Sequence, residues 1–221
     1  MLGIVTATER EFLSVLNSLE NAKEISLIPK RIFKGTFFGI ECVLIWSNVG
    51  KINASLSTQL LIDVYNCDKI LNIGLCGGVD LNLIKGGVYA VDKVVEYDFD
   101  LTVFGNRLGE NDEDKTQFYE INNEYLDKIK CVLKCKSLAT ADKFSEDEKE
   151  IELAKGLGAD LRDMEGVAVL RVCKANNLPC LIVKGVSNGA NSIAKKEYQN
   201  TADYALKKIE ENLEIIAHCL K

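Results

Sequence analysis

Short runs rich in β-branched and aliphatic residues alternate with longer stretches of helical periodicity along this chain. The runs predict strands over 2–6, 31–38, 41–47, 69–73, 88–95, 137–141 and 180–186. The periodic stretches predict helices over 7–20, 51–65, 122–133, 145–157, 164–176 and 198–220. Because strands and helices alternate, we expect one α/β domain over residues 1–221, with a central mixed β-sheet between layers of helices.

Length and charge narrow the class of protein. A chain of 221 residues can form one domain that buries roughly 70% of its extended-chain surface. Its formal net charge is −6, and its lysines are scattered among acidic residues, so no basic stripe is available to bind a phosphate backbone. We therefore expect no nucleic acid among its partners.

The N-terminus and the cysteines indicate the compartment. The chain opens on Leu2-Gly3-Ile4-Val5 without a charged leader, and no apolar run approaches the ~20 residues that span a bilayer. Its 8 cysteines form no Cys-x-x-Cys pair and no metal-ligand spacing, which is typical of buried free thiols in a reducing compartment. We expect a cytoplasmic protein without a membrane segment, a metal or another cofactor.

Acid–base chemistry in this chain must rely on groups other than histidine. The single histidine, His218, lies beside the C-terminus. Two carboxylates and one amide, those of Glu11, Glu165 and Asn188, stand at the mouths of apolar, strand-like segments, which makes a glutamate pair the leading candidate. Either glutamate could instead stabilise the first turn of a helix through the helix dipole.

The segments 72–78 and 105–117 both contain glycines, and the sequence leaves the structural role of each open. The run 72–78 follows a predicted strand but is not Gly-x-Gly-x-x-Gly, which disfavours a dinucleotide-binding fold. Its glycines permit either the close approach of a ligand to the backbone or a tight exit from the strand. The polar segment 105–117 favours a solvated surface loop over a lid.

A set of segments then points to a family. They are 3–11, 47–51, 72–78, 97–105, 141–144, 163–166 and 183–188. In this order they resemble the corresponding blocks of the methylthioadenosine/S-adenosylhomocysteine nucleosidases, within the nucleoside phosphorylase superfamily, and they cover nearly the whole chain. The resemblance implies a single-domain three-layer fold, hydrolysis of the N-glycosidic bond of a purine nucleoside, and a homodimer.

The resemblance also implies roles for individual residues. Glu11 matches the family's general base for water. Glu165 matches the carboxylate that holds the ribose hydroxyls, with Met164 under the sugar. Phe144 matches the aromatic ring on the base, and the backbone of Ser145 is expected to contact the purine edge.

Asn188 departs from the family pattern, which has an aspartate that donates a proton to the purine N7. An amide cannot be that acid, but it can accept from a protonated N7 and donate to an oxygen at C6. That pattern suits a 6-oxopurine, and the superfamily's 6-oxopurine phosphorylases carry Asn there. A futalosine hydrolase or another 6-oxopurine nucleosidase, a purine nucleoside phosphorylase, and a non-catalytic nucleoside-binding protein therefore remain alternatives.

Other positions near the expected substrate also differ. Leu75 replaces a small hydroxyl residue, and Lys184 replaces an arginine; Ser187 lies beside Asn188 in the same block. Because lysine lacks the arginine fork that suits an oxyanion, hydrolysis is favoured over phosphorolysis. Retention of both glutamates favours an enzyme over a non-catalytic binder.

Two apolar features bear on the homodimer. Phe104 is expected to reach into a neighbouring subunit's site, because dimers of this family complete each other's pockets. The apolar positions at helical spacing suit either a dimer face or the core, with the core favoured. They are Ile52, Leu56, Leu60 and Val64.

Overall fold

The computed structural model describes residues 1–26, 28–79, 83–112, 115–189 and 193–221. The helices are α1 (Glu9–Leu16), α2 (Lys51–Asp63), η1 (Thr102–Phe104, a 3-10 turn), α3 (Glu124–Ile129), α4 (Glu148–Gly156), α5 (Gly166–Ala175), α6 (Ala194–Glu210) and α7 (Leu213–Cys219). The strands are β1 (Leu2–Thr6), β2 (Leu19–Glu24), β3 (Ile32–Phe37), β4 (Ile40–Trp46), β5 (Lys69–Gly78), β6 (Val88–Glu96), β7 (Phe118–Glu120), β8 (Cys135–Thr140), β9 (Leu161–Asp163) and β10 (Cys180–Gly189).

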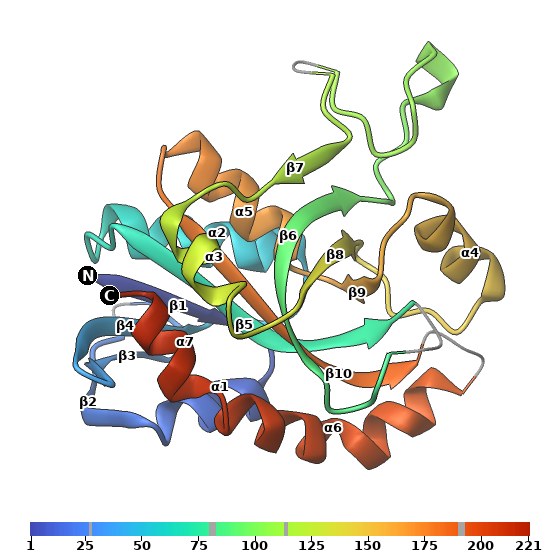
Figure 1. Cartoon of the computed structure of the whole chain (residues 1–221). Coiled ribbons are helices and arrows are strands. Elements are labelled where there is room, and N and C mark those ends of the chain that lie inside the picture. Colours follow the sequence, from blue (N-terminus) through green and yellow to red (C-terminus); the bar gives the residue numbers. More distant parts are fainter. Residues whose placement is uncertain (27, 80–82, 113–114, 190–192) are drawn as a thin grey trace.

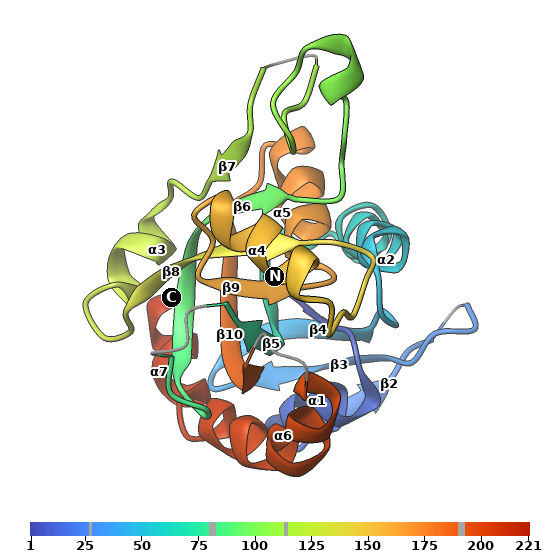
Figure 2. The ribbon, with the colours of Figure 1, turned by 90° about the vertical axis from the view of Figure 1, so that its right-hand side faces the viewer.

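The strands form one mixed sheet, in the order β10-β6-β8-β9-β5-β1-β4-β3-β2, with β7 on β6. Strand β5 pairs in parallel with β1 and β10, and its end pairs in antiparallel with β9. This double pairing of β5 closes β5, β10, β6, β8 and β9 into a ring. Helices α2 and α5 lie on one side of the sheet and α1 and α6 on the other (Figures 1 and 2), which confirms the predicted three-layer α/β fold.

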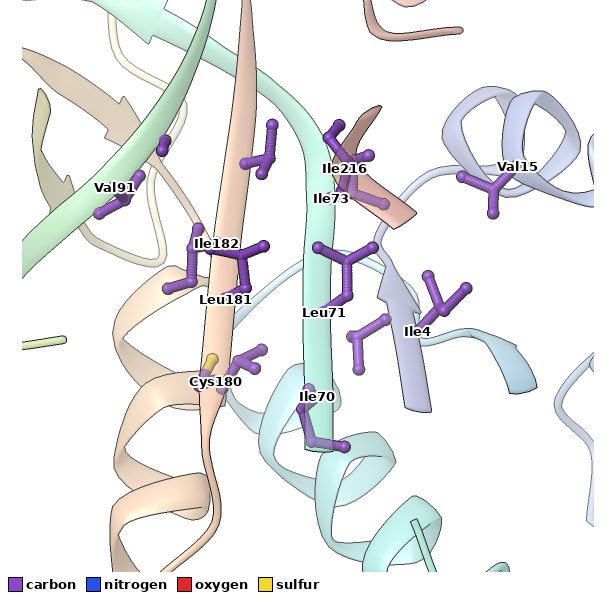
Figure 3. Close-up of a cluster of buried hydrophobic side chains, with 14 of the residues drawn as sticks. Ile4, Val15, Ile70, Leu71, Ile73, Val91, Cys180, Leu181, Ile182 and Ile216 are labelled. Carbon is purple, nitrogen blue, oxygen red and sulfur yellow. The ribbon is translucent and has the colours of Figure 1, made fainter. Parts of the chain in front are cut away.

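Apolar side chains of the parallel central strands form the core (Figure 3). Ile4 of β1 is paired with Leu71 of β5, and Leu71 is paired with Leu181 of β10. All three are fully buried. Central parallel strands are covered on both faces, so their sequences are nearly continuous apolar runs, and each such side chain contributes about 1.5–3 kcal/mol on burial.

Several predicted boundaries are wrong, mostly at the edges of the fold. The helix predicted over 7–20 ends at Leu16, and residues 19–24 form the edge strand β2. The helix predicted over 198–220 begins at Ala194 and is divided into α6 and α7. The polar strand β2 forms by antiparallel pairing with the next strand, β3, and lacks the apolar pattern of a strand. The three-residue strands β7 and β9 form by pairing with strands farther away in the chain, which leaves no pattern in the local sequence.

The expectation that the apolar stripe over α2 belongs to the core is wrong for three of its four residues, and only Leu60 packs against the core. Ile52 is 81% exposed, and Leu56 and Val64 are about half exposed. The helix packs against α5, and at the end of α5 Gln59 and Asn176 exchange hydrogen bonds. Its buried residues include Ala54 and Leu61, and Leu61 lies against Gly3 of β1. An apolar face of α2 therefore stays open in the single chain.

The segment that follows β6 extends away from the sheet (Figure 1, green, at the top). It contains η1 and most of 105–117, and its described part fits the predicted surface loop. Residues 113–114 lie outside the described part of the chain. Among the described helices, none combines the length and apolar character needed to cross a membrane.

Candidate active site

The carboxyl ends of β1, β5 and β10 meet at one edge of the sheet, because these three strands are parallel and adjacent. The segment after β1 leads into α1, which carries Glu11. Leu75 lies in the last part of β5, which ends at Gly78, and Ser187 and Asn188 lie in the last part of β10, which ends at Gly189. In open α/β sheets this edge is the usual position of a ligand site.

Glu11 is 5% exposed and is held by three backbone N–H donors. Leu75 N–H donates to Oε1 at 2.6 Å, while the N–H groups of Thr8 and Ala7 donate to Oε2 at 2.7 and 3.1 Å. The contact with Thr8 is part of a capping box, so Glu11 does cap α1, but it also reaches across to β5. A carboxylate has about four acceptor positions, so one remains, on Oε1.

Gly74 creates the space for this carboxylate. A Cβ at Gly74 would lie 2.6 Å from Glu11 Oε1 and 2.9 Å from its Cδ. Neither of the two roles left open for the glycine run is the one seen at Gly74, where a side chain of this protein, not a ligand, lies against the β5 backbone. Strand β5 continues through the run to Gly78 instead of ending before it.

Glu165 lies at the N-cap of α5 and is 5% exposed. Gly50 N–H donates to its Oε1 at 2.9 Å from the start of α2, where Gly50 has a φ of +102°. Burial raises the pKa of Glu165 to about 8, and the negative charges of Asp163 and Glu11 add to this. The two glutamates therefore share one electrostatic environment.

Asp163 and Lys184 form a buried ion pair beneath these glutamates. Lys184 Nζ lies 2.8 Å from Asp163 Oδ2, and both side chains are at most 2% exposed. Thr140 Oγ1 and Gly166 N–H also donate to Asp163, at 2.6 and 2.8 Å. Burial alone would lower the pKa of Lys184, but the charges of Asp163 and the two glutamates hold it above its ordinary value.

Four of the predicted substrate-contacting residues line one pocket: Phe144, Ser145, Met164 and Asn188. The pocket is completed by Gly77, Lys143, Arg162 and Asp163. The ring of Phe144 is half exposed and meets Tyr198 of α6 edge-on, with centroids 6.1 Å apart. The pocket therefore has an aromatic wall and a polar end.

The Asn188 amide is oriented by its neighbours. Ser187 Oγ donates to Asn188 Oδ1 at 2.8 Å, and Asn188 Nδ2 donates to the Gly189 carbonyl at 3.1 Å. A Cβ at Gly77 would lie 3.1 Å from Nδ2, so the absence of a side chain there leaves room for the amide. Ser187 itself is 1% exposed and is fixed through its carbonyl by the Thr201 hydroxyl.

The remaining predicted residues lie elsewhere. Leu75 is 8% exposed and contributes its backbone N–H to Glu11. Lys184 is enclosed with Asp163 and does not line the pocket. Phe104 is 79% exposed on the projecting segment. The described residues contain no group of three or more His, Cys, Asp or Glu side chains placed to hold a metal.

Asp163 and Gly74 contribute to the site, but they were not selected as site residues from the sequence. Asp163 stands in the same short run as Glu165, and that position was its only signal. Gly74 stands in a glycine run whose role the sequence left open. Both depend on partners far away in the chain, Lys184 and Glu11 respectively, and local patterns do not reveal such pairings.

The chain is similar to known proteins over nearly its whole length. The profile of the phosphorylase superfamily matches residues 1–221. A 5′-methylthioadenosine/S-adenosylhomocysteine nucleosidase of Bacillus subtilis (strain 168) is 31% identical over 219 residues, covering 94% of this chain and 92% of the relative.

Solved structures show the same fold. The corresponding nucleosidase from S. pneumoniae, solved with a transition-state inhibitor, has a TM-score of 0.92 at 25% identity, covering 100% of this chain and 99% of its own. The futalosine hydrolase of Helicobacter pylori strain 26695 has a TM-score of 0.91 at 24% identity, covering 98% and 97%, which shows likeness of fold. This chain belongs to the phosphorylase superfamily and, within it, to the family of the 5′-methylthioadenosine/S-adenosylhomocysteine nucleosidases.

Proposed function

We propose that this protein is an enzyme that hydrolyses the N-glycosidic bond of a purine nucleoside. The observation that carries the proposal is the Glu11 carboxylate, fixed by three backbone donors with one acceptor position left, close to a second buried glutamate. The names of the B. subtilis and S. pneumoniae relatives support the same reaction class.

In the proposed reaction, water attacks the anomeric carbon of the ribose as the bond to the purine nitrogen breaks. Glu11 takes a proton from this water, and the bonding electrons leave with the purine. The purine takes up a proton from solvent, because the Asn188 amide cannot supply one, and Glu11 then releases its proton to solvent. The products are the free base and the free sugar. A general base in this role contributes about 10²–10⁴-fold to the rate.

Glu165 is proposed to hold the ribose hydroxyls. Gly50 N–H already occupies one side of the carboxylate, which leaves Oε2 for the sugar. The positive charge that develops on the sugar favours the ionised form of Glu165, although burial raises the pKa of the free group to about 8. Met164, which lines the pocket beside Glu165, is proposed to lie under the sugar.

Phe144, Ser145 and Asn188 are proposed to hold the base. A second candidate substrate class, the 6-oxopurine nucleosides, is favoured by the Asn188 amide. If Ser187 keeps Oδ1 as the acceptor, Oδ1 is the atom available to a protonated N7, and Nδ2 can donate to an oxygen at C6. Futalosine and inosine are members of this class.

Hydrolysis is proposed over phosphorolysis because of the surroundings of Lys184. Its ammonium group is paired with Asp163 and almost fully buried, so it is already neutralised within the protein. Leu75, at the position where the family has a hydroxyl residue, offers no polar side chain to phosphate. A phosphorolytic enzyme needs a phosphate pocket, usually built with unpaired cations.

A homodimer is proposed from two exposed apolar surfaces. Ile52 on α2 is 81% exposed, and Val103 and Phe104 on the projecting segment are 84% and 79% exposed. Side chains of this size are commonly covered by a partner when several gather. We propose that Phe104 reaches the site of the partner subunit. The free cysteines suit the reducing cytoplasm, which we propose as the compartment.

The test is release of free base from a panel of nucleosides, with and without phosphate. The panel contains methylthioadenosine, S-adenosylhomocysteine, adenosine, inosine and futalosine. Base release that does not depend on phosphate supports hydrolysis. Base release only with phosphate would make the protein a phosphorylase, and tight nucleoside binding without base release would make it a non-catalytic binder.

A further inference from the structure

We propose that Arg162 determines base specificity by donating to an oxygen on the six-membered ring of the base. This inference rests on the proposed function, because it assumes that the pocket holds a base. No sequence pattern selects Arg162, which lies on the short strand β9. Its surroundings in the folded chain carry the inference.

Arg162 is a buried charge with an unused donor. Arg162 is 9% exposed. Its Nη1 atom is buried and has no hydrogen-bond partner among the described residues. Within the same part of the chain, no carboxylate lies at salt-bridge distance from its guanidinium group. Burying an unpaired charge is costly, so such a group calls for an acceptor that the protein does not supply.

The rest of the guanidinium group is fixed. Nη2 is within 3.5 Å of the Ser145 carbonyl, to which it donates, and the group lies 5.6 Å from the centre of the Tyr97 ring. The Tyr97 hydroxyl is also buried without a partner among the described residues. Tyr97 is not among the residues that line the pocket, so Arg162 is the pocket residue whose unused donor a ligand would satisfy.

Arg162 and Asn188 flank the same glycine. In the sheet, Arg162 is paired with Gly77, and the Asn188 amide lies over the space that a Gly77 side chain would fill. Arg162, Ser145 and Asn188 all line the pocket. A base held against Phe144 would therefore meet the Asn188 amide and the Arg162 guanidinium group from two neighbouring directions.

The donors of Arg162 select against an amino group. Guanidinium has donors only and stays protonated, so it binds a carbonyl oxygen well and opposes an amine. The Ser145 carbonyl, which an exocyclic amine would need as its acceptor, is already approached by Nη2. Both features favour a base with an oxygen at C6 over adenine.

The test compares hypoxanthine with adenine as ligands. Dissociation constants of both free bases are measured by calorimetry for the parent, Arg162→Met and Arg162→Lys, with Lys155→Gln on the exposed surface of α4 as a control for lost charge. Loss of one charge-assisted hydrogen bond should weaken hypoxanthine about 10- to 100-fold in Arg162→Met, while adenine binds equally well or more tightly. Arg162→Lys should retain part of the preference.

Thermal unfolding separates this role from a structural one. Removal of an unpaired buried charge should leave the melting temperature of Arg162→Met equal to or above that of the parent. A lower melting temperature with equal weakening of both bases would overturn the proposal, and so would failure of the parent to bind hypoxanthine at millimolar concentration. If no nucleoside releases its base, the proposed hydrolysis fails, but the dissociation constants still test Arg162.

Discussion

The Cα of Gly74 and the carboxylate of Glu11 are in such close contact that a Cβ at Gly74 would lie 2.6 Å from Oε1. Strand β5 therefore supports the proposed general base in two ways, through the N–H of Leu75 and through the missing side chain of Gly74. Positions at which a catalytic group touches the backbone admit only glycine without rearrangement.

Gly74→Ala should displace Glu11 and reduce turnover strongly while nucleoside binding is less affected. A shift of the base by about 1 Å can cost about 10²-fold in rate. The measurement is kcat and KM on the best nucleoside of the panel. Gly156→Ala is the matched control, because no heavy atom lies within 4 Å of a Cβ built there, and it should retain parent activity. Parent-like kcat in Gly74→Ala would show that the Glu11 position is not critical.

Glu11→Gln should lower kcat by about 10²–10⁴-fold, because an amide cannot take a proton from water. Nucleoside binding should largely survive, since the side chain keeps its size. Glu9→Gln on the same helix, where the residue is exposed, controls for the loss of one negative charge. Activity within a few-fold of the parent in Glu11→Gln would mean that another group activates the water.

Glu165 predicts a pH dependence of activity. Its pKa is raised to about 8, so the fraction of free enzyme with the ionised carboxylate grows as pH rises toward that value. If the ionised form binds the ribose, kcat/KM should rise with pH through this window and then level off. Glu165→Gln should be much less active and should lack this rise. A parent profile that is flat between pH 6 and about 9 would contradict the assignment.

The same pKa makes a prediction for stability. Between its ordinary value of 4.5 and about 8, the folded protein keeps a proton on Glu165 that the unfolded chain has released. The contribution of Glu165 to the free energy of unfolding therefore falls as pH rises across that window and is constant above it. The free energy of unfolding is measured by denaturant titration at a series of pH values for the parent and for Glu165→Gln. Plotted against pH, the two curves should differ most in slope between these two pH values. Parallel curves would contradict the raised pKa.

Lys184→Met should destabilise the fold, because it leaves the Asp163 carboxylate buried without its counter-charge. Breaking a buried pair in this way costs about 3–5 kcal/mol in the free energy of unfolding. Lys208→Met, which breaks a partly exposed pair with Glu211, should change the free energy of unfolding little. Equal stability of the two variants would mean that Asp163 is not charged in the folded protein.

The sequence predicts the central part of this fold better than its edges, for a physical reason. Runs such as 69–73 and 180–186 are apolar because both sheet faces are covered, so their composition marks them as strands. Strand β9 and the ring closure depend on pairing between distant segments. The exposed stripe around Ile52 has the same periodicity as a core stripe, and only its position in the fold separates the two.

The same distinction applies to the site. Glu11 and Asn188 could be selected because they stand near the ends of β1 and β10, which meet at one edge of the sheet. Glu165 follows β9, which is antiparallel to β5, and its selection depends more on the family resemblance. The sequence does not predict that Lys184 is buried against Asp163 or that Arg162 has an unused donor, since both features arise from contacts across the sheet. Residue types at strand ends are visible in a sequence, whereas the partners they meet are not.

Asn188→Asp should shift substrate preference toward methylthioadenosine. A carboxylic acid can donate to the purine N7 and, once ionised, can accept from the adenine amino group. In the parent, the NH2 of the Asn188 amide would face the adenine NH2, and two donors cannot form a hydrogen bond with each other. The variant and the parent are compared by kcat/KM on methylthioadenosine, inosine and futalosine. Because Asn188 precedes Gly189, slow deamidation could create some aspartate in the parent, so intact mass must be verified first. If verified parent protein cleaves methylthioadenosine as fast as Asn188→Asp and leaves 6-oxopurine nucleosides intact, the amide does not select the base.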